Sequence, residues 1–146
     1  MNEKLQQYRK SETEKKTVTE LIIMVYDGAI DNLKKASEFY NNDKMQDGYE
    51  AMEKAKRFVV HLYTTLDEEK GGEVAENLSK MYAYIIERMN FIQATKDIET
   101  IDESISLLSN IKEGWVGLAE QEKKGQLKNN NNLGAAIPKK GLSFSA

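Results

Sequence analysis

The chain has 146 residues, of which 40% are apolar and 31% charged, and 24 acidic against 21 basic residues give a formal net charge of −3. This composition predicts one soluble globular domain, and the small net charge, mixed along the chain, offers no electrostatic surface for nucleic acid or an anionic membrane. The absence of cysteine excludes disulfides and thiol catalysis, and no apolar run approaches the ~20 residues needed to cross a bilayer.

Residues 1–16 are polar and charged, with Tyr8 as their one aromatic side chain. They lack the apolar stretch of a secretory signal, so we expect a flexible arm on a cytoplasmic protein. A helix start follows at Thr17, because its hydroxyl can cap the first amides while Glu20, three residues later, reaches back in a capping box. This first helix is predicted over residues 18–40 and is ended by the run 41–43, Asn-Asn-Asp.

Three more helices are predicted over residues 44–66, 73–94 and 98–124, with a loop at 67–72 and with Gly114 and Gly117 as weak points in the last one. Apolar residues recur at spacings of three and four and nowhere alternate, so no strand is expected. Four helices of this length with short connections predict an all-α protein, an antiparallel up-down four-helix bundle over residues 17–124.

Residues 125–146 differ from the rest of the chain. Four consecutive asparagines, two internal glycines and the one proline predict a disordered tail. Its apolar residues form either a short docking motif or nothing specific, and these are Leu133, Ile137, Leu142 and Phe144.

Each helix carries more apolar surface than a bundle core needs. The residues outside the expected core stripes are Met24, Tyr49, Val60, Tyr84 and Phe91. Helix ends and bundle edges often bury such residues. Exposed apolar patches, however, usually mark binding, and a groove between helices suits an amphipathic partner helix. Tyr84 and Phe91 lie seven residues apart among charged neighbours, which favours a surface role for this pair.

The sequence contains almost no candidates for catalytic residues. His61 is the one histidine, so neither a di-iron bundle with two Glu-x-x-His motifs nor a histidine zinc site can be built. The pair Gly71-Gly72 lacks the Lys-Ser/Thr that follows in a phosphate-binding loop. We therefore expect no enzyme activity, no metal and no cofactor.

One catalytic alternative is a histidine phosphotransfer bundle. The helical spacing places His61 on a polar face near Lys54 and Arg57. Such modules usually follow the histidine with Lys and Gly, whereas here residues 62–65 are Leu-Tyr-Thr-Thr. A solvated surface histidine is the preferred interpretation.

Three segments in order, LIIMVYDGAIDNLKKA (21–36), LDEEKGGEVAENLSKMYAYIIERM (66–89) and IDESISLLSNIKEGW (101–115), resemble the flagellin-specific export chaperones of the FliS family. The likeness covers residues 8–120, and Tyr8 resembles the aromatic of that family's N-terminal arm. Its most distinctive pieces are Met24-x-Tyr26-Asp27-Gly28, the Gly71-Gly72-Glu73 turn leading to Asn77-Leu78, Tyr82-x-Tyr84, and Trp115. Val18 stands where the family usually has proline, and the tail is outside the pattern.

The resemblance implies a bundle that binds the C-terminal segment of flagellin, blocks premature polymerisation and keeps the chain fit for export. It also implies a docking contact with the export gate. The expected contact residues are Tyr8, Met24, Phe58, Val60, Tyr84 and Phe91. An alternative from the residues alone is a general helical interaction module whose apolar stripes pack against a second copy, so a homodimer stays open.

Overall fold

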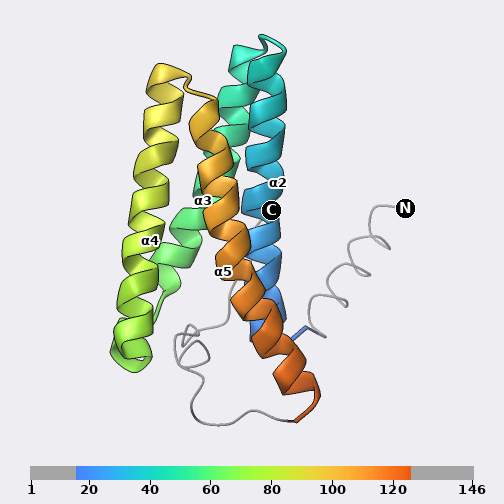
Figure 1. Ribbon diagram of the computed structural model, residues 1–146, viewed down its shortest axis with the longest axis vertical. Coiled ribbons are helices and arrows are strands. Elements are labelled where there is room, and N and C mark those ends of the chain that lie inside the picture. The colour runs from blue at the N-terminus through green and yellow to red at the C-terminus, as the bar shows by residue number, and fades with distance from the viewer. Residues whose placement is uncertain (1–15, 126–146) are drawn as a thin grey trace, which may run out of the picture.

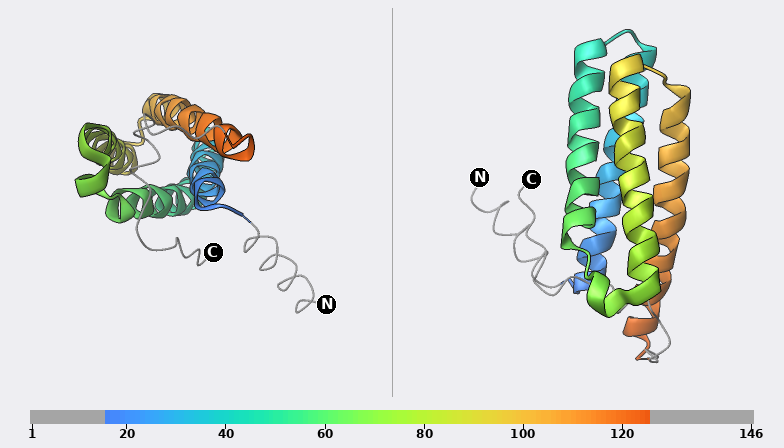
Figure 2. Two further views of the ribbon diagram at one scale, coloured as in Figure 1. Left: turned by 90° about the horizontal axis from the view of Figure 1, so that it is seen from below. Right: turned by 90° about the vertical axis from the view of Figure 1, so that its left-hand side faces the viewer.

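The computed structural model describes residues 16–125, which form four helices and, within that range, no strand. These are α2 (Val18–Asn41), α3 (Met45–Thr65), α4 (Glu68–Thr95) and α5 (Glu99–Lys123). Consecutive helices run antiparallel and pack side by side, and α5 returns to α2 (Figure 1). The view along the bundle shows the closed ring of four (Figure 2). The predicted up-down bundle is confirmed, while the predicted arm and tail lie, but for Lys16 and Gly125, outside the described residues.

The start of α2 is fixed by the predicted capping box. The Thr17 hydroxyl accepts a hydrogen bond from the Glu20 amide at 3.1 Å, and the Glu20 carboxylate accepts one from the Thr17 amide at 3.4 Å. Two amides that have no partner inside the helix are thereby satisfied. The helix thus begins at Val18 without a proline there.

The start of α4 differs from the sequence prediction, in which residues 67–72 form a loop. Asp67 caps the helix by accepting a hydrogen bond from the Lys70 amide at 3.1 Å, so that one helical turn forms from Glu68. The chain then kinks at Gly72, whose φ of 55° and ψ of −132° are not helical, and continues as α4. Acidic residues in the first turn favour this early start because they face the positive end of the helix dipole.

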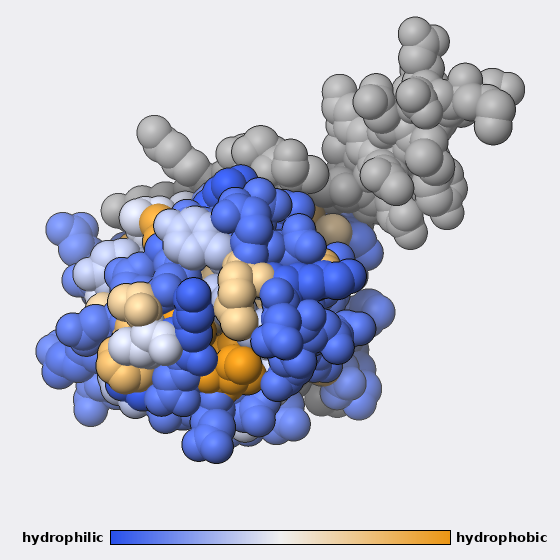
Figure 3. Space-filling view, turned by 90° about the horizontal axis from the view of Figure 1, so that it is seen from above, coloured by the Kyte–Doolittle hydropathy of each residue, from blue (hydrophilic) through white to orange (hydrophobic). Residues whose placement is uncertain are grey.

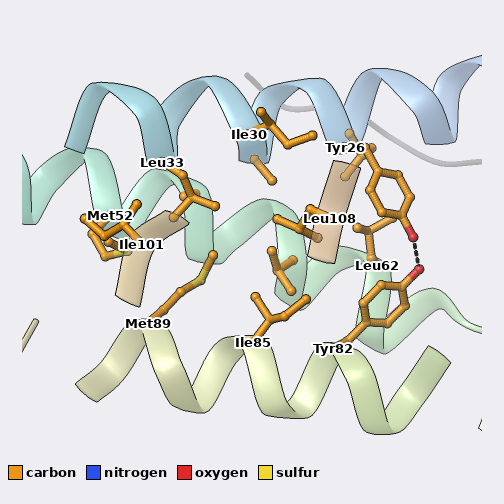
Figure 4. Close-up of a cluster of buried hydrophobic side chains, with 14 of the residues drawn as sticks. Tyr26, Ile30, Leu33, Met52, Leu62, Tyr82, Ile85, Met89, Ile101 and Leu108 are labelled. Carbon is orange, nitrogen blue, oxygen red and sulfur yellow. Dashed lines mark hydrogen bonds between the residues drawn. The ribbon is translucent and has the colours of Figure 1, made fainter. Parts of the chain in front are cut away.

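The core contains residues from all four helices, including the side chains drawn in Figure 4. Across it, the hydroxyl groups of Tyr26 and Tyr82 hydrogen-bond to each other, and the Trp115 indole Nε1 donates to the Tyr26 hydroxyl at 3.2 Å. Buried polar groups need such partners because they have lost water. Burial raises the pKa of Tyr82 to about 12 and the pKa of Tyr26 well above its ordinary value. This network links α2, α4 and α5 and fixes their positions relative to one another.

Two glycines let α2 and α3 approach closely. A Cβ atom on Gly28 would lie 2.7 Å from the ring of Phe58, and one on Gly48 would lie 2.7 Å from the ring of Tyr40. Each aromatic ring therefore lies directly over the glycine backbone of the neighbouring helix. Glycine is required at both positions by this packing and not by a turn.

Candidate partner-binding surface

Seven large apolar side chains of the described residues remain between 37% and 45% exposed. They are Val18, Met24, Tyr49, Val60, Tyr63, Tyr84 and Phe91. Five of the seven belong to α3 and α4, and the hydrogen bonds between neighbouring helices show which side of each helix they occupy. These five side chains form two groups, one along each edge of α4.

The first group lies where α3 meets α4. Lys56 of α3 donates hydrogen bonds to the side-chain oxygens of Asn90 and Gln93 on α4, both at 2.8 Å. Lys56 thus marks the side of α3 that faces α4. Tyr49 precedes it by seven residues, and Val60 and Tyr63 follow it by four and seven, so all three lie on that same side. We call Tyr49, Val60 and Tyr63 the α3–α4 seam.

The second group lies where α4 meets α5. The Tyr84 hydroxyl donates a hydrogen bond to the carboxylate of Glu103 on α5, which raises the pKa of Tyr84. The Arg88 guanidinium donates to the Thr100 hydroxyl at 3.4 Å and lies 4.8 Å from the centre of the Phe91 ring. These contacts hold both aromatic rings at the edge of α4 that faces α5.

Half-buried apolar residues lie on both helices beneath this edge. Met81 precedes Tyr84 by three residues on α4, and Leu107 and Ile111 follow Glu103 by four and eight on α5. We call Met81, Tyr84, Arg88, Phe91, Leu107 and Ile111 the α4–α5 seam. The two helices diverge towards the end where α4 begins (Figure 1).

Met24 and Phe58 belong to a third side of the bundle. Met24 is exposed on α2, one turn before Gly28, and Phe58 is half-buried because its ring covers Gly28. Phe58 therefore has a packing role in addition to any contact with a partner. Tyr8 lies outside the described residues. The expected contact residues are thus distributed over three sides of the bundle and do not line one groove.

Tyr49 and Tyr63 are absent from the contact residues expected from the sequence. The helical spacing of Tyr63 assigns it to the widened core stripe of α3, yet it is 41% exposed. The signal that could have identified Tyr49 and Tyr63 is their spacing, because each lies seven residues from Lys56 and therefore on the same side of the helix as Lys56. Which side of α3 faces α4 becomes known only from the pairing of the helices.

His61 is half-buried, and its Nε2 atom has no contact with solvent, so the expected solvated surface position is wrong. Its carbonyl accepts a hydrogen bond from the Thr65 hydroxyl at 2.7 Å. Phosphotransfer needs an accessible ring nitrogen, and the burial of Nε2 counts against that function.

Residues 16–125 contain neither a metal-binding cluster nor a membrane-spanning helix. No group of three or more His, Asp or Glu side chains in that range is placed to hold a metal ion. Of the four helices, none is both long and apolar enough to cross a membrane.

The end of the bundle that carries the α2–α3 and α4–α5 loops shows apolar side chains between hydrophilic ones (Figure 3). The half-buried apolar residues next to these loops are Phe39, Met45 and Ile98. They cover the end of the core, so this apolar area is continuous with the packing beneath it.

The sequence matches the family described as "Flagellar protein FliS" over residues 1–122. It is 40% identical to the flagellar secretion chaperone FliS of Salmonella typhimurium over 97 residues, which cover 66% of this chain and 72% of the relative. It is 30% identical to the flagellar secretion chaperone FliSB of Pseudomonas aeruginosa, with 68% and 79% covered. The crystal structure of a bacterial flagellar chaperone has the same fold, with a TM-score of 0.68, 24% identity, and coverage of 82% of this chain and 97% of the other.

Proposed function

Because the chain belongs to the FliS family of flagellar secretion chaperones, we propose that it binds the C-terminal segment of flagellin in the cytoplasm, prevents premature polymerisation and keeps that segment competent for export. Its task is binding, with no catalytic step and no cofactor. The observation that carries the proposal is the pair of apolar seams on either edge of α4, where five large side chains are more than a third exposed.

The chemistry of the seams fits helical segments of a partner. Each seam combines aromatic rings with hydrogen-bonding groups at its rim, namely Lys56 on one side of α4 and Arg88 with Glu103 on the other. An amphipathic helix docks in such a groove with its apolar face inward and its polar face in water. Aromatic and arginine side chains are also the residues that most often dominate interface energies.

The distribution of contact residues over three sides favours a partner that wraps around the bundle. Met24 and Phe58 lie between α2 and α3, while the two seams lie on either side of α4. A compact partner would cover one side, whereas a chain that folds on binding can follow several sides and bury a large area per residue. Helices held apart in this way cannot associate with other flagellin molecules. We include in the proposal a docking contact with the export gate.

The proposal is tested by calorimetric titration of the full chain with a peptide of the last ~50 residues of flagellin from the same species, a length that allows several helical turns. We expect saturable one-to-one binding with a large negative heat-capacity change, because apolar burial is coupled to helix formation. Binding that is unchanged when flagellin lacks this segment would contradict the proposal.

A matched pair of variants locates the contact. Tyr84→Ser/Phe91→Ser removes two exposed aromatic rings and should weaken binding by about 30- to 1000-fold, since each buried aromatic anchor contributes roughly 1–2 kcal/mol. Val18→Ser removes a similarly exposed apolar side chain from α2, away from both seams, and should leave the affinity nearly unchanged. Equal effects of the two changes would exclude the α4–α5 seam as the contact.

A general interaction module is the second candidate, since the same exposed seams could pack against another copy of the chain. Sedimentation velocity of the free protein separates the two. A monomer agrees with the chaperone, whereas a tight dimer that buries Tyr84 and Phe91 supports the module.

A further inference from the structure

The first turns of α4 border an open hollow of about 830 Å³ on the surface. Its lining residues are Glu68, Gly72, Glu73, Glu76, Asn77 and Lys80. Glu73, Asn77, Lys80 and Tyr84 follow one another at spacings of four, three and four, so they form one stripe along α4. The hollow is therefore the continuation of the α4–α5 seam towards the end where the two helices diverge (Figure 1).

The hollow is acidic. Three carboxylates and one ammonium among its lining residues give it a local charge of −2. Glu76 forms an ion pair with Lys80 at 3.4 Å, which leaves the carboxylates of Glu68 and Glu73 as the excess. An occupant of this part of the seam should therefore carry basic residues next to apolar ones.

Residues 126–146 of the same chain have that composition. They contain three lysines and no acidic residue, which gives a charge of +3. Lys139 and Lys140 lie between Ile137 on one side and Leu142 and Phe144 on the other. The segment thus presents two adjacent positive charges flanked by apolar side chains.

The segment also starts at the correct end of the bundle. It follows Gly125, just after α5, and the Glu122 carboxylate near that end accepts a hydrogen bond from Thr19 at the start of α2, at 2.7 Å. In an up-down bundle, α2 and α4 begin at the same end. The twelve residue-to-residue steps from Gly125 to Ile137 span up to ~40 Å, whereas the stripe from Glu73 to Tyr84 is only ~17 Å long. The reach is ample.

We propose that residues 137–144 dock in cis along the α4–α5 seam, with Lys139 and Lys140 against the carboxylates of the hollow and Leu142 and Phe144 against the apolar side chains beyond it. The two charges set the position and direction of the segment, and the apolar residues supply most of the burial. The docked segment occupies the surface that Tyr84 and its neighbours otherwise leave exposed.

The docking is tested by paramagnetic relaxation in the full chain. The protein has no cysteine, so Ser145→Cys gives a single site for a nitroxide label. We expect strong broadening of the amide signals of Asn77, Lys80 and Leu107, and none at Lys35 on the outer side of α2. Broadening confined to the end of α5, or located on α2 and α3, would overturn the proposal. Broadening of unlabelled molecules mixed with labelled ones would also overturn it, because it would show docking on a second copy.

Charge reversal provides the matched control. Lys139→Glu/Lys140→Glu should reduce the broadening at Asn77 and Lys80 at least several-fold. Combining these changes with Glu73→Lys/Glu76→Lys should restore the broadening. Loss without restoration would show that these charges do not pair, against the proposal. All four changes lie on exposed or terminal positions, and thermal unfolding of each variant checks that the bundle is intact.

One consequence rests on the proposed function, because the docked segment would compete with flagellin for the α4–α5 seam. Lys139→Glu/Lys140→Glu should then bind the flagellin peptide several-fold more tightly than the unchanged chain. Equal affinities would overturn the competition. No binding by either protein would overturn the flagellin function, while the broadening experiment, which uses no flagellin, would still decide the docking.

Discussion

At the scale of single residues, several side chains identified by their sequence pattern have two roles. Phe58 is an expected partner contact, but its ring also fills the space above Gly28. Tyr84 is exposed, yet its hydroxyl is held by Glu103. A periodic pattern reports how far a residue lies from the core and not what it touches. The spacing could therefore predict the exposure of Met24, Val60, Tyr84 and Phe91, but not the burial of Nε2 in His61, which depends on neighbours distant in sequence.

Because Gly28 lies so close to Phe58, we predict that Gly28→Ala and Gly117→Ala change the free energy of unfolding in opposite directions. In Gly28→Ala the new Cβ would lie 2.7 Å from the Phe58 ring, so overpacking of about 1–3 kcal/mol outweighs the ~1 kcal/mol gain in helix propensity. We expect a loss of about 1 kcal/mol in the free energy of unfolding, measured by urea denaturation. In Gly117→Ala the new Cβ would meet no atom within 4 Å beyond the adjacent residues and the backbone of its own helix, so the protein should gain ~0.5–1 kcal/mol.

Phe58→Leu tests the cause of that difference. With the ring gone, Gly28→Ala should no longer destabilise, and the double-mutant cycle should show coupling between the two positions. A gain in stability from Gly28→Ala alone, equal to that from Gly117→Ala, would contradict the prediction, because it would show that the Phe58 ring moves aside without an energetic penalty.

At the scale of helices, apolar periodicity, the capping box and the asparagine run could predict α2, α3 and α5 to within a residue or two of their ends. The start of α4 could not be predicted in this way, because two adjacent glycines normally indicate a loop. Asp67 and the acidic first turn instead sustain one helical turn before the kink at Gly72. The pairing of helix sides that creates the two seams is a tertiary property, so the sequence pattern of one helix does not contain it.

The kink predicts that Gly72 cannot be replaced without strain. Its φ of 55° and ψ of −132° correspond to the first central residue of a type II′ turn, where glycine is favoured. Gly72→Ala meets no neighbouring atom, so its cost of ~1–3 kcal/mol is backbone strain alone. Hydrogen exchange should show faster exchange of the amides of residues 68–76, with α2 and α5 much less affected. Uniform acceleration across all four helices would contradict a local role for the kink.

At the scale of the whole molecule, the buried tyrosines link stability to alkaline pH. The folded-state pKa of Tyr82 is about 12 and that of Tyr26 is also raised, both by burial, against an unfolded value of ~10. The folded protein therefore retains protons that the unfolded chain releases, and stability is full below pH ~10 and is lost as the pH rises towards 12. Tyr82 alone should account for about 2–3 kcal/mol.

Urea denaturation at a series of pH values measures this dependence. Tyr82→Phe should reduce the slope of the unfolding free energy above pH ~10. At neutral pH it should destabilise less than Tyr26→Phe, because the latter leaves both Trp115 Nε1 and the Tyr82 hydroxyl without their partner. An unchanged slope in Tyr82→Phe would assign the alkaline transition to other groups.

The hydrogen bond from Thr19 to Glu122 spans 103 residues, and the bond from Trp115 to Tyr26 spans 89. The other neighbouring helices are consecutive in the chain, so most contacts form between segments joined by short loops. Chains dominated by such local contacts fold in microseconds to milliseconds, far faster than a ribosome adds residues. The α5–α2 pair is thus the one pair of adjacent helices in the described bundle that joins distant parts of the chain, and a newly synthesised molecule completes the bundle almost as soon as α5 emerges.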